Sequence, residues 1–228
     1  MNIALVVVLL ILIVNAFYGR KAGLIKTVFS LFSMVAAVLL SSFISPQVSK
    51  VLQENEAVVE YMSDKVEAVL PLEDLGNKIT DQISFVDSLP IPASMKTSII
   101  ENNNSDTYAQ MAVDNFTAYI THAVANIILN AIAFIVTFLV IIIVLNIVCS
   151  VLNIISKLPI LNQINKTAGM LVGIAQGLII IWVLGILVTV FSGSTMGQEI
   201  FKMINENEFL SFLYDNNLIL RFIANVFL

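Results

Sequence analysis

The chain has few residues that could carry out chemistry. Its 228 residues include one histidine, His122, and one cysteine, Cys149. His122 has no Cys, Asp or Glu at metal-ligand spacing, and a single thiol can form neither a disulfide within the chain nor a thiolate cluster. The patterns G-x-S-x-G, H-E-x-x-H and the phosphate-binding loop do not occur. The sequence therefore predicts no enzymatic activity, no metal site and no cofactor. We expect His122 at a membrane interface and Cys149 to be a small packing residue.

Uncharged polar residues within apolar segments are the next candidates. Asn126, Asn130 and Gln176 lie at the depth of expected membrane spans, and Asn126 and Asn130 share a helix face. Such side chains usually face a protein interior or water, and they join helices by hydrogen bonds worth about 0.6–2 kcal/mol each. No acidic or basic residue lies well inside an expected span, which argues against a proton- or ion-coupled transporter. This absence does not argue against a passive pore.

Three glycines, Gly169, Gly173 and Gly177, recur at every fourth residue and share one helix face. Glycine allows another helix backbone to approach closely, and this promotes packing in lipid, where no hydrophobic force acts between helices. The spacing predicts a helix-packing face. Packing within the chain is favoured over self-association, because several spans already offer partners.

The composition indicates the class of protein that holds these residues. The chain is 58% hydrophobic and 12% charged, whereas soluble domains are about 25% charged. This excludes a soluble globule, and the high hydrophobicity excludes disorder. Residues 46–118 carry four lysines and twelve acidic residues, a net charge of −8, and no Asp or Glu precedes Glu54 or lies between Asp114 and Glu199. Two apolar blocks therefore flank an acidic insert, and we expect the lipid bilayer rather than nucleic acid as a partner.

Four apolar stretches can cross a bilayer core about 30 Å thick, which needs about 20 mostly apolar residues. The predicted fold is an all-α integral membrane protein with four transmembrane helices in two hairpins, at residues 1–45 and 119–192. The first span is short, about 24 Å, and we expect it not to be a cleaved signal peptide, because its basic residues follow it. The second span ends at Pro46. The expected spans are about 3–18, 24–45, 122–149 and 168–191.

Basic residues in the short loops predict the orientation of the spans. One group lies between the first two spans and another between the last two, and neither loop has an acidic residue. Because basic short loops stay in the cytoplasm, we expect both termini and the insert at 46–118 to be extracytoplasmic. The topology-determining residues are Arg20, Lys21, Lys26, Lys157 and Lys166.

The insert and the tail are predicted to form helices outside the bilayer. Apolar residues at helical spacing predict one helix up to Pro71, and a weaker one is expected at about 73–86. A turn at 102–106 starts a helix that could run unbroken into the third span. The tail, 193–228, is predicted to form amphipathic helices that rest at the interface or pack on the bundle.

The chain resembles the colicin V production protein family of bacterial inner-membrane proteins. The resemblance rests on the basic, glycine-containing turn at 18–26, on residues 157–166 leading into the glycines of the fourth span, and on the tail at 209–217. The insert is not matched. Relatives often have arginine where this chain has Gln176, so a charge-dependent role there is not carried over. The resemblance implies a bacterial cytoplasmic membrane and a role in producing or exporting a peptide toxin, and it implies no catalytic residues.

Three hypotheses of function follow from these features. The first is a non-enzymatic membrane protein that supports toxin (bacteriocin) production or secretion and envelope function through a membrane-protein partner. The second is a homo-oligomeric channel or passive pore with Asn126, Asn130 and Gln176 near a wet path. The third is a purely structural envelope-stability factor.

Overall fold

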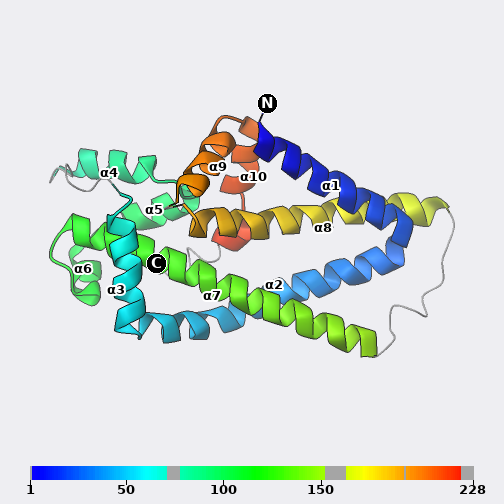
Figure 1. Ribbon diagram of the computed structural model, residues 1–228, viewed down its shortest axis with the longest axis horizontal. Helices are drawn as coiled ribbons and strands as arrows, with labels where there is room; N and C mark the ends of the chain where they lie inside the picture. Colours follow the sequence, from blue (N-terminus) through cyan, green and yellow to red (C-terminus); the bar gives the residue numbers. More distant parts are fainter. Residues whose placement is uncertain (1, 71–77, 152–162, 193, 222–228) are drawn as a thin grey trace.

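The computed structural model describes residues 2–70, 78–151, 163–192 and 194–221, and every regular element in them is an α-helix (Figure 1). Four helices are long: α1 (Ile3–Ala22), α2 (Leu24–Gln53), α7 (Phe116–Val151) and α8 (Gln163–Val190). Each is long and apolar enough to cross a membrane. The prediction of an all-helical fold is confirmed in the described residues, and these four helices are candidate membrane spans.

Two of the long helices extend beyond their expected ends. Helix α1 continues to Ala22, so its 20 residues span about 30 Å rather than the short length expected. Helix α2 does not end at Pro46 but runs through it to Gln53. A proline inside a helix removes one backbone hydrogen bond, and here the helix continues because its packing on α7 extends to Gln53.

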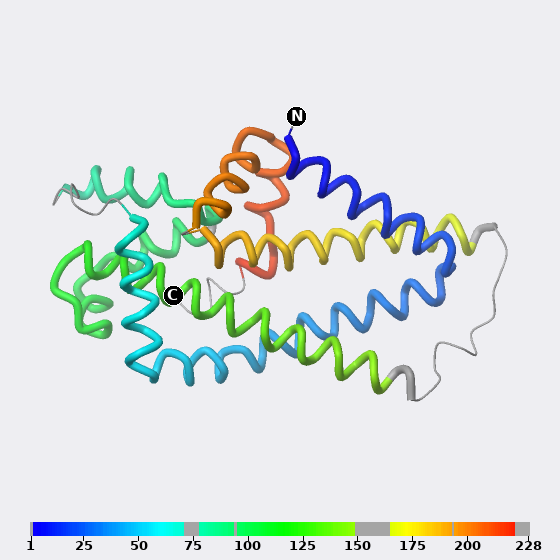
Figure 2. Tube along the Cα trace, in the orientation of Figure 1, coloured from blue at the N-terminus to red at the C-terminus, as the bar shows by residue number. Residues whose placement is uncertain are grey.

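The long helices pack mainly with partners that are distant in the sequence. Helix α1 lies along α8, α2 lies along α7, and α2 also contacts α8. Figure 2 shows α1 and α2 diverging from the turn that joins them. The N-terminal half of α7 is the best-buried part of the described structure, and Tyr119, Ala123 and Phe134 in it are fully buried. Residues 139–148, in the C-terminal half, include no buried side chain.

The described residues of the insert contain four short helices: α3 (Glu56–Glu67), α4 (Ile79–Ser88), α5 (Ala93–Glu101) and α6 (Ser105–Met111). The helix expected up to Pro71 is interrupted, because the Asn55 side chain accepts a hydrogen bond from the Val58 N–H and starts α3 anew. The helix start at 102–106 is confirmed by the Asn104 cap of α6. The unbroken run into the third span is wrong: Ala112 adopts φ 54°, and the Asn115 side chain caps the start of α7. Part of the expected helix at 73–86 lies outside the described residues.

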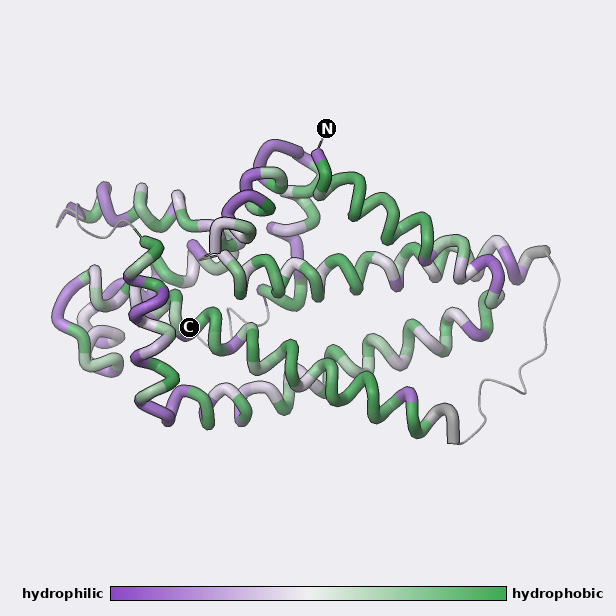
Figure 3. The backbone as a smooth tube through the Cα atoms, viewed as in Figure 1, coloured by the Kyte–Doolittle hydropathy of each residue, from purple (hydrophilic) through white to green (hydrophobic). Residues whose placement is uncertain are grey.

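The tail forms α9 (Thr195–Asn205) and α10 (Glu208–Asp215), and both pack on the bundle. Asn2 donates its side-chain amide to the carbonyl of Met203 in α9 at 2.5 Å. The Tyr214 hydroxyl lies 2.9 Å from that of Thr189 in α8, and burial raises the Tyr214 pKa. The chain start, the tail and the C-terminal end of α8 therefore meet at one end of the long helices. Figure 3 shows hydrophobic residues along the long helices and hydrophilic ones gathered toward the ends.

Candidate functional site

The three glycines predicted to pack helices lie on the side of α8 that faces α1. A Cβ atom added at Gly169 would overlap the carbonyl oxygen of Gly19, and one added at Gly173 would overlap that of Asn15. At Gly177 the nearest atoms would be side-chain atoms of Asn15 and Leu12, at 3.3 Å. The closest backbone approach is therefore at the first two glycines, and it holds α1 to α8 of the same chain.

The turn between α1 and α2 contacts the start of α8 at the end of these helices away from the tail. Gly23 joins α1 to α2 with φ 82°, a conformation that favours glycine. The N–H of Leu24 donates to the side-chain oxygen of Asn165 at 2.8 Å, so a residue of α8 caps the start of α2. Arg20, Lys21, Lys26 and Lys166 are near this contact in the chain, whereas Lys157 lies outside the described residues.

Replacing Asn165 with alanine is expected to lower the free energy of unfolding by about 1 kcal/mol, because the Leu24 N–H loses its cap. Denaturant titration in detergent micelles measures this loss. Asn165→Asp keeps the acceptor oxygen and should retain most of the stability. Equal losses in the two variants would contradict a capping role.

The polar residues expected in the membrane mainly join helices. Asn130 is fully buried, and its side-chain oxygen accepts hydrogen bonds from Ser49 and Gln53 of α2. Gln176 of α8 donates to the Ser30 hydroxyl at 3.1 Å. Asn126 is partly buried on α7. None of the three lines either of the cavities described below.

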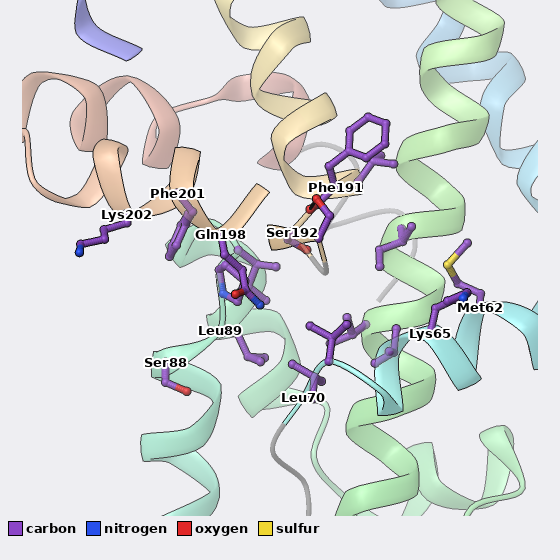
Figure 4. A pocket seen from close by; sticks show the side chains of 18 of the residues that line it. Met62, Lys65, Leu70, Ser88, Leu89, Phe191, Ser192, Gln198, Phe201 and Lys202 are labelled. Atoms are coloured by element: carbon purple, nitrogen blue, oxygen red, sulfur yellow. Dashed lines mark hydrogen bonds between the residues drawn. The ribbon is translucent and has the colours of Figure 1, made fainter. Parts of the chain in front are cut away.

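A cleft of about 1000 Å³ opens among α3, the α4–α5 connection, α7 and α9 (Figure 4). We call it the outer cleft. Its floor is formed by Val124, Ile128 and Ile132 of α7, and its lining is mostly apolar. Other apolar lining residues include Met62, Val66, Leu70, Phe85, Leu89, Ile91, Val190 and Phe191.

Lysines from opposite walls border the outer cleft. Lys65 of α3 lies over the Tyr61 ring, 5.4 Å from its centroid. Lys202 of α9 lies 4.0 Å from Glu206, and the two side chains are mostly exposed. Figure 4 shows Lys65 and Lys202 on opposite sides of the cavity.

Contacts between α5 and the tail helices connect the insert to the tail. The Ala93 N–H donates to the Asp215 carboxylate at 3.2 Å. Lys96 of α5 lies 6.0 Å from the centroid of the Phe201 ring, and Phe201 lines the outer cleft. Burial lowers the pKa of Lys96, and the nearby carboxylates of Asp87 and Asp215 partly offset that effect. The cleft wall is thus assembled from both segments.

Helix α9 separates the outer cleft from a second cavity of about 460 Å³ among α1, α8, α9 and α10. Phe191, at the end of α8, lines both cavities. The position of α9 is fixed at Gly197, where an added Cβ would overlap the carbonyl oxygen of Phe191.

Replacing Gly197 with alanine is expected to push α9 away from Phe191 and to cost about 1–3 kcal/mol of stability, the usual range for overpacking. Hydrogen exchange of the α9 amides should become faster. Met196→Ala changes the neighbouring side chain, which is 71% exposed, and is the control. Unchanged exchange in the Gly197 variant would contradict the tight contact.

Sequence reasoning did not find the outer cleft. Its walls come from segments between residues 61 and 206, and each contributes ordinary apolar residues with no local pattern. Within the described parts of the chain, no group of three or more His, Cys, Asp or Glu residues could hold a metal ion. The cleft therefore offers apolar surface and lysine side chains rather than a ligand set for a metal.

Residues 107–218 match the family model described as colicin V production protein. This segment, just under half of the chain, belongs to the colicin V production protein family. No curated protein and no solved structure matches the chain. The matched segment includes α7, α8, α9 and α10, and so the α7 and α9 sides of the outer cleft. The α3 and α4 walls lie outside the match.

Proposed function

We propose that this protein is a non-enzymatic component of a bacterial cytoplasmic membrane that supports the production or secretion of a peptide toxin of the colicin V type. It does so by binding another membrane protein through the helices outside the bilayer. Family membership supports the toxin context. The four long apolar helices support the membrane location.

The proposed orientation places the basic turns in the cytoplasm and the insert, the tail and both termini outside. The contact between Leu24 and Asn165 joins the α1–α2 turn to the start of α8. The contact between Asn2 and Met203 holds the N-terminal end beside the tail. Because basic short loops stay inside, the other end would face the exterior.

The observation that carries the partner proposal is the assembly of the insert and the tail into one platform at the same end of the spans. Helices α5 and α10 are joined through Ala93 and Asp215. The platform exposes large apolar side chains, with Ile79 of α4 72% exposed and Phe212 of α10 63% exposed. A contiguous apolar patch outside the bilayer marks a protein interaction site, and these two side chains are the positions at which we propose to look for one.

Photocrosslinking in native membranes tests the proposal. A photoreactive amino acid at Ile79 or Phe212 should give adducts with a different membrane protein. Phe32, 71% exposed on α2, is the control, because the proposal places it against lipid. Only monomer at Ile79 and Phe212 would contradict the proposal.

The second hypothesis, that the protein is a homo-oligomeric channel, remains a prediction. Asn130 and Gln176 make hydrogen bonds between helices of one chain, so a wet path along them would need those contacts to open. Solute flux through purified protein in liposomes would support a channel, and its absence would remove this alternative.

A further inference from the structure

The C-terminal half of α7 is an apolar helix with little packed against it. Helix α2 packs on α7 around Asn130, whereas residues 139–148 include no buried side chain. Figure 2 shows the C-terminal end of α7 separating from both α2 and α8. Because α7 is apolar enough to cross a membrane as far as Val148, this surface faces either lipid or another membrane helix.

Four residues on this surface follow a seven-residue repeat, and we call them the α7 seam: Val136, Leu139, Ile143 and Asn146. The three apolar members are 50–57% exposed, and Asn146 is exposed as well. Alternating spacings of three and four residues place these side chains on one side of the helix, as in coiled coils. Val136 and Ile143 at the first position of the repeat, with Leu139 at the fourth, favour a pair of parallel helices.

Asn146 adds a polar group to the α7 seam. Its amide donates to the Ile142 carbonyl of its own helix at 2.7 Å, and within the described residues the structure records no hydrogen bond to its side-chain oxygen. No Asp, Glu, Lys or Arg lies between Asp114 and Lys157, so Asn146 belongs to an uncharged, apolar stretch. A polar atom that faces lipid without a partner is costly, and asparagine side chains in membranes form hydrogen bonds across helices.

A second copy of this chain meets the requirements of the α7 seam. Copies that insert into the membrane with the same orientation can bring their α7 helices together only in parallel. A two-fold axis along the membrane normal then places identical residues opposite each other at the same depth. The asparagine side chain is both a donor and an acceptor, so Asn146 is complementary to Asn146 of the second copy.

We propose that the protein forms a parallel homodimer through the α7 seam, in which the two Asn146 side chains are hydrogen-bonded to each other at the two-fold axis. This proposal is independent of the partner protein proposed above, because the crosslinking positions Ile79 and Phe212 lie outside α7. It also differs from the channel hypothesis, because none of the polar residues considered for a wet path belongs to the seam.

Energy transfer between donor- and acceptor-labelled full chains in phosphatidylcholine liposomes, measured over a range of protein-to-lipid ratios, tests the proposal. Asn146→Leu should weaken association about tenfold, because hydrogen bonds between membrane helices are worth up to about this factor. Asn146→Gln keeps a donor and an acceptor and should retain most of the association. The Asn146 side chain forms its hydrogen bond only within its own helix, so these changes report association rather than folding.

Disulfide crosslinking in membranes locates the interface. In a chain that carries Cys149→Ser, Ile143→Cys should give a covalent dimer on oxidation, because the two-fold axis brings the two thiols together. Val148→Cys is the matched control. Val148 is also exposed on α7, but it lies about 140° around the helix from Ile143, so its thiols should face away from the axis and give little dimer.

Several results would overturn the proposal. Energy transfer no greater than that of randomly distributed monomers, at every protein-to-lipid ratio, would show that the chain does not self-associate. Unchanged association of Asn146→Leu would show that the asparagine pair does not hold the dimer. Equal crosslinking at positions 143 and 148 would show random collision instead of a defined seam. Energy transfer that is not proportional to the acceptor fraction would show a larger assembly. An unchanged helical circular dichroism spectrum confirms that each variant is folded.

Discussion

Replacing Gly173 with alanine is expected to lower the free energy of unfolding by about 1–2 kcal/mol. The added methyl group would overlap the carbonyl oxygen of Asn15. This atom belongs to the backbone, so α1 must move as a whole, and overpacking of this kind typically costs about 1–3 kcal/mol. Alanine also gains about 1 kcal/mol over glycine in helix propensity, so a net loss means that the steric cost is the larger effect. Denaturant titration in detergent micelles measures the change.

Gly177→Ala is the matched control on the same face of α8. Its methyl group would meet the Cβ of Asn15 and the Cδ2 of Leu12 at 3.3 Å, so it is close to both but overlaps no backbone atom. We therefore expect little change, or a small gain from helix propensity. Equal losses in the two variants would contradict the close approach of α1 at Gly173.

Replacing Asn130 with leucine is expected to cost about 1–3 kcal/mol, because Ser49 and Gln53 lose the oxygen that accepts their hydrogen bonds. The Asn130 amide nitrogen is itself buried without a partner, and its removal offsets part of this cost. Equilibrium unfolding in micelles gives the difference. The triple variant Asn130→Leu, Ser49→Ala, Gln53→Leu should recover most of the stability, because it leaves no donor unpaired.

Asn146→Leu is the control for the polar residues of α7. Asn146 is exposed and donates only to Ile142 of its own helix. Its replacement should therefore leave the stability of the bundle nearly unchanged. A loss as large as that of Asn130→Leu would show that burial against α2 is not what makes Asn130 important.

The sequence predicted the long helices because a membrane span is a local property. Twelve consecutive aliphatic residues from Ile3 to Val14 identify α1, whatever packs on them. Helix ends were less predictable. Pro46 suggested an end to the second span, but α2 continues through it, since its packing on α7 extends to Gln53.

The partners of the candidate residues could not be predicted, because they are distant in the sequence. The spacing of Gly169 and Gly173 indicated a packing face but not that Asn15 and Gly19 would lie against it. The same holds for Asn130, whose hydrogen-bond partners lie 77 and 81 residues away. The outer cleft depends on several such contacts at once and therefore had no signal in any one segment.

In the proposed orientation the basic turns and the insert lie on opposite sides of the membrane. Single cysteines at Lys21 and Asp106, in a chain whose native Cys149 is replaced by serine, test it most directly. A membrane-impermeant maleimide added to intact cells should label the cysteine at 106, and should label the one at 21 only after the membrane is permeabilised. Labelling of both positions from the same side would contradict the four-span arrangement and the external platform that depends on it.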